Sequence, residues 1–392
     1  MLRKTWIIFA AVLVLSAGVL AKTTETVIYY LYTDGGAGPE APVVLDRSGN
    51  LYGTASFGGV NGYGTVFELT PSGSGWTPTI LYSFHGGSDG GNLYGPVILD
   101  KHGNVFGTTW MGGKFGAGTV FELKSVGGQW SEKVLHDFDS SSEDGAYPGS
   151  GLLFDADGNL YGTTELGGAA YHGVVFELIP TGDGQWTETT LYSFTGGDDG
   201  EYPTAGVALD NAGNIYGTTP SAGASGYGTV YELMPSEGGW TETSVHTFIG
   251  GDDGADPSGP VVLDASGNVY GTTLSGGGAC GCGTVFELHA DKEWAESVIY
   301  GFKAKNDGAG PVGGVVLDKF GDIYGAASGG KLEIGTVFIL THSILGWTIH
   351  PESLTVYNAA YPRAGVTLDG IGNIYGTVFG EGGSGAVFLI NF

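Results

Sequence analysis

The sequence has no stretch of ten or more residues in which apolar side chains recur with the period of an amphipathic helix. It has only two cysteines, Cys280 and Cys282, so no disulfide framework can organise the chain. A bridge across one intervening residue would be strained, and two thiols are too few for a structural metal site. We interpret the pair as local loop chemistry, and a strained, redox-sensitive bridge stays open as the alternative.

Positive charge is also scarce. Fourteen Lys and Arg stand against 41 Asp and Glu, the formal charge is −27, and no Lys or Arg occurs between Val134 and Asp291. Such a chain repels nucleic acid and anionic lipid, so we expect neither as a partner. It should attract cations or basic partners, although solubility of an exported protein would explain the same composition.

Long apolar runs are missing except for one at the start. Arg3 and Lys4 precede an apolar run over residues 6–20, which is shorter than the ~20 residues that a membrane span requires. We predict that residues 1–21 are a signal peptide and that the mature chain has no membrane span. The expected location is therefore secreted, periplasmic or extracellular.

Motifs of catalysis are absent as well. The sequence contains no HExxH, no GxSxG, no P-loop and no GxGxxG before a helix. The eight histidines do not recur as a set, which argues against a ring of metal-binding imidazoles. We assign no catalytic residue and expect no required cofactor.

Glycine and an internal repeat are what the chain has in abundance. Its 76 glycines show no Gly-X-Y period, which indicates many tight turns between short strands. The string LDxxGN or a close variant of it recurs seven times, at intervals of 51 to 55 residues. Its aspartates are Asp46, Asp100, Asp155, Asp210, Asp264, Asp318 and Asp369.

Each repeat predicts four strands, here named a to d: a VVLD-like strand, NxYGTT, GTVFEL, and a run such as WTETTLYSF. Four short antiparallel strands in about 50 residues are typical of a β-propeller blade. The last repeat ends after strand c, and the segment 24–32 reads as a strand d without its repeat. We therefore predict an all-β, seven-bladed β-propeller in which residues 22–392 form one domain and strand 24–32 closes the ring beside residues 386–390.

The LDxxGNxYGTT…GTVFEL unit resembles the GloVer-type tandem repeat of exported bacterial proteins, and the similarity covers essentially the whole mature chain. The resemblance implies a secreted, propeller-like array and no particular activity. Members often carry a C-terminal sorting segment, which this sequence does not show.

Two recurring residue types are expected to be scaffold. The turn aspartates should accept hydrogen bonds from the amides of their own turns. Six tryptophans begin strand d, and repetition at a fixed position predicts packing between neighbouring blades. They are Trp76, Trp130, Trp186, Trp240, Trp294 and Trp347.

The face that carries the b–c and d–a connections is the better candidate for binding. The b–c connections vary most between repeats, and four d–a connections carry a tyrosine: Tyr94, Tyr147, Tyr202 and Tyr361. Aromatic rings among carboxylates could stack on a sugar or grip a peptide, or could fold onto their own blade. The residues predicted to bind a ligand are Trp110, Phe115, Tyr147, Tyr171, His172, Tyr202 and Tyr227.

The same face carries Asp-Gly turns, three of which double the acid. Adjacent carboxylates repel each other, and a hard cation would relieve the repulsion, so we predict weak calcium binding. Turn formation alone would also explain these acids. The predicted metal residues are Asp144, Asp198, Asp199, Asp252 and Asp253.

These observations favour an exported, non-enzymatic binding propeller that engages a glycan or protein partner and is a monomer. The alternative is a polysaccharide lyase or glycoside hydrolase, and a structural role in the cell envelope is a third possibility. An enzyme needs a constellation that breaks the sevenfold repeat, for which the sequence offers His172 beside Tyr171.

Overall fold

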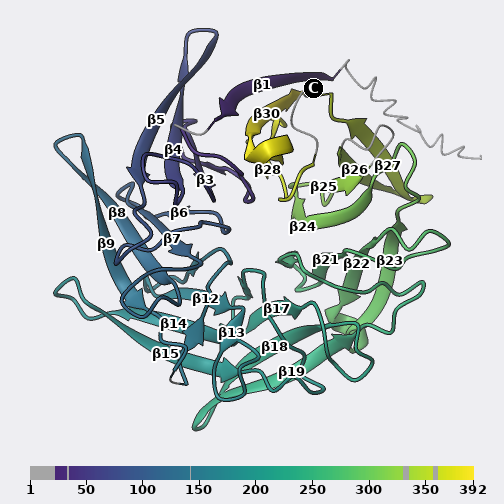
Figure 1. Ribbon diagram of the computed structural model, residues 1–392. Helices are drawn as coiled ribbons and strands as arrows, with labels where there is room; N and C mark the ends of the chain where they lie inside the picture. Colours follow the sequence, from purple (N-terminus) through teal and green to yellow (C-terminus); the bar gives the residue numbers. More distant parts are fainter. Residues whose placement is uncertain (1–22, 33–34, 142, 330–334, 356–360) are drawn as a thin grey trace, which may run out of the picture.

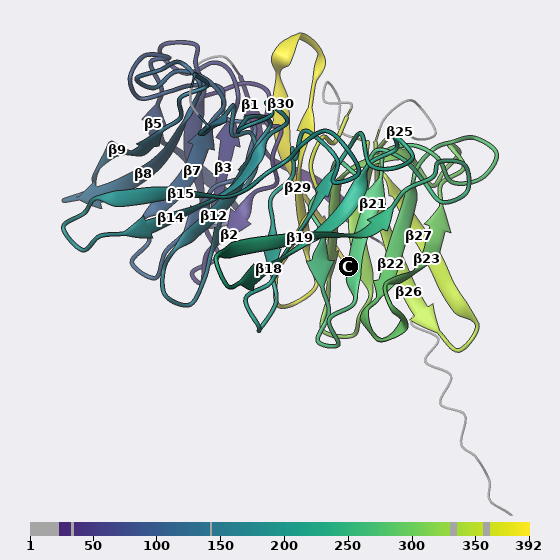
Figure 2. The same ribbon diagram turned by 90° about the horizontal axis from the view of Figure 1, so that it is seen from below.

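The computed structural model describes residues 23–32, 35–141, 143–329, 335–355 and 361–392. Seven four-stranded antiparallel sheets stand around a central channel (Figure 1), which confirms the predicted seven-bladed propeller. Seen from the side, the connecting loops gather on the two faces of the ring (Figure 2). No helix among these residues is long and apolar enough to cross a membrane.

Each blade runs from an inner strand a to an outer strand d, and in the first six blades the strands pair in chain order. In blades one to three the strands are β2 (Val44–Leu45), β3 (Leu51–Ala55), β4 (Thr65–Ser72), β5 (Gly75–Ser83); β6 (Ile98–Leu99), β7 (Val105–Thr109), β8 (Thr119–Val126), β9 (Gln129–Asp137); and β11 (Leu153–Phe154), β12 (Leu160–Thr164), β14 (Val174–Pro180), β15 (Trp186–Ser193). A separate two-stranded ribbon joins β10 (Gly145–Ala146) to β13 (Leu166–Gly167).

Blades four to six repeat the plan, with a longer strand a in blade six. Their strands are β16 (Ala208–Leu209), β17 (Ile215–Thr219), β18 (Thr229–Ser236), β19 (Gly239–Thr247); β20 (Val262–Leu263), β21 (Val269–Thr273), β22 (Thr284–His289), β23 (Ala295–Gly301); and β24 (Ala309–Leu317), β25 (Ile323–Gly329), β26 (Thr336–Ser343), β27 (Gly346–Ser353). Two single-turn 3₁₀ helices, η1 (Ala290–Lys292) and η2 (Glu381–Gly383), complete the regular structure.

Blade seven is built from both ends of the chain. It contains β28 (Thr367–Leu368), β29 (Ile374–Phe379) and β30 (Gly385–Asn391), and its outer strand is β1 (Thr24–Leu31). β1 pairs antiparallel with β30, from Thr24 opposite Asn391 to Leu31 opposite Gly385. The predicted closure of the ring is therefore confirmed.

Aromatic rings fill the space between neighbouring blades. The phenylalanine at the end of strand d meets the buried aromatic ring of strand c in the next blade, as Phe84 meets Phe121 with ring centres 5.0 Å apart. Room for the strand-c ring comes from the glycine of YGTT: a Cβ on Gly53 would collide with the ring of Phe67. The glycine of YGTT and the aromatic residue of GTVFEL thus pack directly against each other.

The tryptophans that begin strand d also pack between blades, as predicted. Trp76 of blade one meets Tyr375 of blade seven at 6.1 Å, and Trp186 of blade three meets Phe106 of blade two at 6.2 Å. Each indole lies against the strand-b aromatic residue of the preceding blade. These tryptophans therefore serve to pack neighbouring blades together, because they lie on the outer strand and away from the channel.

Candidate functional site

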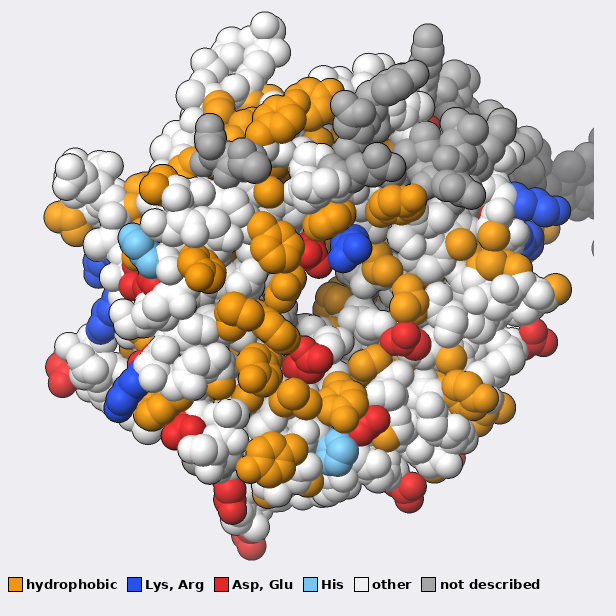
Figure 3. All heavy atoms as spheres, in the orientation of Figure 1, with side chains coloured by type: hydrophobic (Ala, Val, Ile, Leu, Met, Phe, Trp, Pro, Cys, Tyr) orange, Lys and Arg blue, Asp and Glu red, His pale blue; other side chains and the backbone are white. Residues whose placement is uncertain are grey.

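The b–c and d–a connections lie on one face, because the two segments pair with each other. Backbone bridges join Ala37 to Phe57, Gly91 to Met111 and Tyr361 to Phe379, each linking a d–a segment to the following b–c segment. Figure 3 shows this face, with a hollow at its centre. Apolar and acidic side chains surround the hollow, and one basic side chain stands at its edge.

One repeat position, six residues before the turn aspartate, supplies the rim of the channel. Strand a is the innermost strand of each blade, and the seven residues at this position line one cavity together. The seven rim residues are Glu40, Tyr94, Gly149, Thr204, Ser258, Val312 and Arg363. Together with Trp110 and Glu165, all of them except Val312 line a cavity of about 440 Å³ at the channel mouth.

An acid and a base meet at the mouth across the closure of the ring. Nη1 of Arg363, in blade seven, lies 3.4 Å from Oε2 of Glu40, in blade one. The Arg363 guanidinium lies 4.4 Å from the ring centre of Phe379. Oγ of Ser56 donates to Oε1 of Glu40 over 3.3 Å. Both oxygens of the Glu40 carboxylate are therefore oriented by neighbours.

Beside this pair, an aromatic cluster occupies blades two and three. The Trp110 ring lies 5.8 Å from Tyr94 and 4.9 Å from Tyr147 between ring centres. Its indole Nε1 donates to Oε2 of Glu165 over 3.1 Å, which fixes the orientation of the tryptophan. Burial raises the pKa of Tyr94, so its phenol stays protonated at neutral pH and can donate a hydrogen bond.

The large side chains form an arc rather than a ring. The position ten residues after the turn aspartate reads Ser56, Trp110, Glu165, Pro220, Leu274, Ser328 and Phe379 around the seven blades. Aromatic and charged groups lie on blades seven, one, two and three, while blades four to six present proline, leucine, serine, threonine and valine. The mouth therefore breaks the sevenfold repeat, as a specific site must.

Of the seven predicted ligand-binding residues, Trp110 lines the cavity at the mouth, and Tyr147 packs against the Trp110 ring without lining that cavity. His172 and Tyr202 form a separate pair 5.7 Å apart, with Nδ1 of His172 lying 2.9 Å from Oε2 of Glu201. His172 also covers the backbone of Gly196 in its own d–a loop. The pair folds onto neighbouring loops, and Tyr171 beside it is exposed.

The remaining two predicted residues lie away from the cluster at the mouth. Tyr227 covers Gly250 of the adjacent d–a turn. Phe115 is exposed and lies beneath the ammonium group of Lys114, which is 4.7 Å from the ring centre. Neither side chain lines the cavity at the mouth.

Four residues at the mouth were not among those predicted: Glu40, Tyr94, Glu165 and Arg363. For Glu40, Tyr94 and Arg363 a signal is available in the sequence, since aligning the repeats on the turn aspartate shows that the position six residues earlier changes in every unit, whereas Glu165 lies ten residues after its turn aspartate. Only the assembled ring, however, places Glu40 beside Arg363, which is 323 residues further along the chain.

The paired acids of the d–a turns point in different directions. Asp198 and Asp252 are exposed, whereas Asp199 is buried. Oδ2 of Asp199 accepts hydrogen bonds from the backbone amide of Thr195 and from the hydroxyl of Tyr192. The Asp-Gly acid thus holds its own turn, as the alternative interpretation expected, and calcium binding at these residues stays a prediction.

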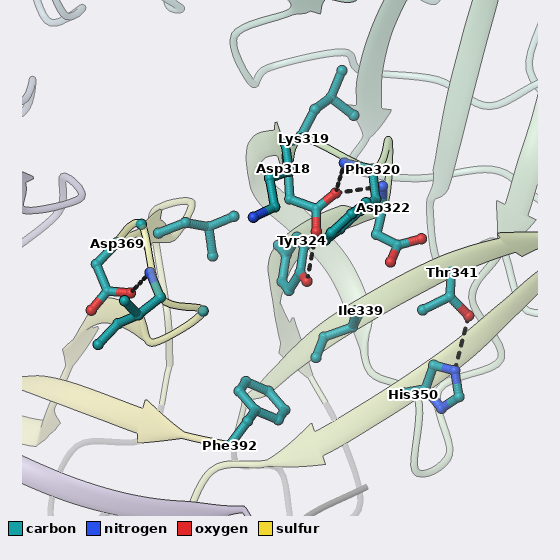
Figure 4. Close-up of a pocket in the computed structure, with 15 residues that line it drawn as sticks. Asp318, Lys319, Phe320, Asp322, Tyr324, Ile339, Thr341, His350, Asp369 and Phe392 are labelled. Atoms are coloured by element: carbon teal, nitrogen blue, oxygen red, sulfur yellow. Dashed lines mark hydrogen bonds between the residues drawn. The ribbon is translucent and has the colours of Figure 1, made fainter. Parts of the chain in front are cut away.

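A second cavity lies on the opposite face, between blades six and seven (Figure 4). It has a volume of about 770 Å³, and its wall includes Tyr324, Ile339, Leu368 and Phe392. These residues correspond to those that surround a strand-d tryptophan in other blades. In blade seven that position is Thr23, which precedes β1. We interpret this larger cavity as the space of a missing indole and place the candidate site at the channel mouth.

The comparisons with known proteins support the fold. The structure is similar to that of a Bacteroides uniformis ATCC 8492 protein named as a candidate 6-phosphogluconolactonase, with 14% identity over 83% of this chain and 88% of that chain and a TM-score of 0.52. It is also similar to a Lactobacillus plantarum protein, with 16% identity over 85% of this chain and 89% of that chain and a TM-score of 0.54. At these identities the likeness concerns the fold alone.

A search of curated protein sequences returned no match. The sequence profile of the Gloeobacter/Verrucomicrobia repeat, in contrast, matches residues 17–210 and 184–389, which together span nearly the whole chain. The predicted resemblance to this tandem repeat is thereby confirmed, and the chain belongs to the Gloeobacter/Verrucomicrobia repeat family.

Proposed function

We propose that the protein is an exported, non-enzymatic binding propeller that holds a glycan at its channel mouth. The observation that carries the proposal is the aromatic pair Tyr94 and Trp110, with Tyr147 packed against Trp110, flanked by Glu40, Glu165 and Arg363. Aromatic faces stack on the apolar face of a sugar ring, and carboxylate and guanidinium groups bind its hydroxyls. A cavity of about 440 Å³ accommodates one or two sugar units.

The wide, open mouth suits one end or one branch of a chain rather than its middle. Rim residues from all seven blades surround the mouth, so no open groove crosses it. A polymer must therefore enter the channel with one end first. Blades four to six offer small side chains there, which leave space beside the aromatic cluster. A basic peptide loop is the competing occupant, because acidic residues outnumber basic ones across the chain.

A glycan array followed by calorimetry on the strongest ligand tests the proposal. Trp110→Ala should weaken binding at least tenfold, because it removes both the stacking surface and the partner of Glu165. Phe115→Ala is the matched control, since this exposed aromatic residue belongs to the same b–c loop but lies outside the cavity. Equal losses in the two variants, or binding of basic peptides and no glycan, would overturn the proposal.

Turnover assays on the same oligosaccharides separate binding from catalysis. Two carboxylates, Glu40 and Glu165, line the mouth, and a pair of carboxylates is what glycoside hydrolysis uses. A non-enzymatic protein returns every bound oligosaccharide unchanged. Cleavage that Glu165→Gln abolishes while binding persists would establish the enzyme in place of the binding protein.

A further inference from the structure

Four interfaces between neighbouring blades repeat one arrangement of three side chains at the outer edge of the ring. Each contains a residue near the end of strand d, the aspartate of the next Asp-Gly turn, and a glutamate on strand d of the following blade. The sets are Tyr82–Asp89–Glu132, His136–Asp144–Glu188, Tyr192–Asp199–Glu242 and His246–Asp253–Glu296. The first member alternates between tyrosine and histidine, so every second interface carries an imidazole.

The two histidine sets place a nitrogen and two carboxylates within coordination range of one point. Nε2 of His136 lies 3.0 Å from Oδ2 of Asp144, and Nε2 of His246 lies 3.3 Å from Oδ1 of Asp253. In each set one ligand atom from each of the three residues lies within 4.8 Å of the other two. A tetrahedral ion with bonds of about 2.1 Å has ligand atoms about 3.4 Å apart. A small rotation of the glutamate side chain therefore closes either set around an ion.

The protein alone leaves donor atoms unused in the set of blades four and five. Oε1 of Glu296 is buried and has no hydrogen-bond partner, and Nε2 of His246, also buried, has only its 3.3 Å contact with Oδ1 of Asp253. Buried polar atoms are normally paired, so orphaned atoms that converge on one point indicate a group to bind there.

We propose that the sets His136–Asp144–Glu188 and His246–Asp253–Glu296 are two equivalent binding sites for a divalent transition-metal ion of the zinc class. One imidazole and two carboxylates form a donor set that such ions accept, and three protein ligands leave a coordination position for water. Calcium prefers six to eight oxygen ligands, so an imidazole in the set disfavours it. These sites are distinct from the channel mouth and independent of its ligand.

The tyrosine interfaces show why histidine is the deciding residue. The hydroxyl of Tyr192 donates to Oδ2 of Asp199 over 3.0 Å, and that of Tyr82 donates to Oδ2 of Asp89 over 3.2 Å. Burial raises the pKa of both phenols, so they remain protonated and cannot serve as anionic ligands. The same backbone thus accepts tyrosine or histidine, and only histidine adds a metal-binding nitrogen.

This alternation supplies variants that preserve the fold. The full chain, freed of metal with a chelator and dialysed, is titrated with Zn²⁺ by calorimetry, and bound zinc is counted after gel filtration. We expect two ions per chain in the wild type, one in His136→Tyr, one in His246→Tyr and none in the double variant. Tyr192→His should raise the count to three, because it gives the interface of blades three and four the full donor set. Visible absorption of Co²⁺ in place of Zn²⁺ reports whether nitrogen and oxygen ligands surround the ion.

The control is His102→Ala, which removes an exposed histidine from a turn on the opposite face and should leave two ions bound. Circular dichroism checks that each variant is folded, and Glu296→Gln provides a second way to disable one site without changing a histidine. An unchanged zinc count in the folded double variant would overturn the proposal. So would a wild-type protein that binds Ca²⁺ at these residues more tightly than Zn²⁺.

Discussion

Each turn aspartate directs its carboxylate inward, onto its own turn. Oδ1 of Asp155 accepts hydrogen bonds from the backbone amides of Asp157, Gly158 and Asn159 at 2.8–2.9 Å, and Oδ2 accepts one from the Asn159 side chain. The other repeats make corresponding bonds, and blade six lacks only the side-chain bond because Asp322 replaces the asparagine. The seven acids are therefore structural, as their turn context predicted.

Asp155→Ala should lower the free energy of unfolding by about 1.5–3 kcal/mol, the range for hydrogen bonds to a charged group. The reason is that several turn donors lose their acceptor at once. Asp157→Ala is the matched control, because this acid lies in the same turn and its side chain is exposed. Urea unfolding measures both. Similar losses in the two variants would show that charge in the turn matters and the hydrogen bonds do not.

At the scale of strands, one irregular element explains the cavity between blades six and seven. In six blades strand d begins with a tryptophan. In blade seven the equivalent residue is Thr23, whose hydroxyl donates a hydrogen bond to Glu352 over 2.9 Å. Thr24 pairs with Asn391, so Thr23 stands beside Phe392 at the wall of the cavity between blades six and seven. The N-terminal strand that closes the ring therefore supplies no tryptophan to the interface between blades six and seven.

Thr23→Trp should fill this cavity and raise the free energy of unfolding by about 0.5–2 kcal/mol, as cavity-filling substitutions commonly do. The expected contacts are with Tyr324, Ile339 and Leu368, which line the cavity. Thr24→Trp is the control, since the neighbouring position is exposed on the strand and its side chain points the other way. Thermal unfolding distinguishes the two. Equal effects of both substitutions would mean that the cavity is not the site of a missing indole.

The strands were predictable because the residues that determine them lie within each repeat. These residues are the turn aspartate, the glycine beneath an aromatic ring, and a strand d in which buried and exposed side chains alternate. The mouth was less predictable, because its residues come from different repeats and only ring closure brings them together. Trp110 and Tyr147 were found as aromatic residues in variable loops. Glu165 and Arg363 have no local pattern of their own, and their role depends on neighbours in the assembled ring.

At the scale of the whole molecule, the ring combines a uniform scaffold with two departures from sevenfold symmetry. The arc at the mouth is a single constellation spread over four blades, whereas the alternation of tyrosine and histidine at the outer edge follows a period of two blades. The two patterns lie at different radii and share no residues, so a change in one need not disturb the other. A propeller can therefore carry a central ligand and peripheral ions independently.

The glutamates of the outer interfaces also make stability depend on pH. Burial, followed by the charge of the neighbouring aspartate, raises the pKa of Glu132 and of Glu188 to about 7. Burial, followed by a hydrogen bond with Asp253 and by the charge of Asp253, raises the pKa of Glu296 to about 8, and burial raises that of Glu242. Between the ordinary pKa of 4.5 and these raised values, the folded state holds protons that the unfolded state has released.

Because the folded state binds more protons in this window, stability should be highest near pH 5 and fall as the pH rises to about 8.5. Unfolding by urea at fixed ionic strength, with a chelator present, measures the slope. Glu132→Gln with Glu296→Gln should flatten it and raise stability at pH 8, since a neutral amide replaces each carboxylate that would otherwise ionise beside an aspartate. Glu237→Gln, at an exposed hairpin position, removes the same charge without burial and should leave the slope unchanged. If that control flattened the curve equally, the pH dependence would arise from the overall negative charge of the ring, and not from the glutamates between its blades.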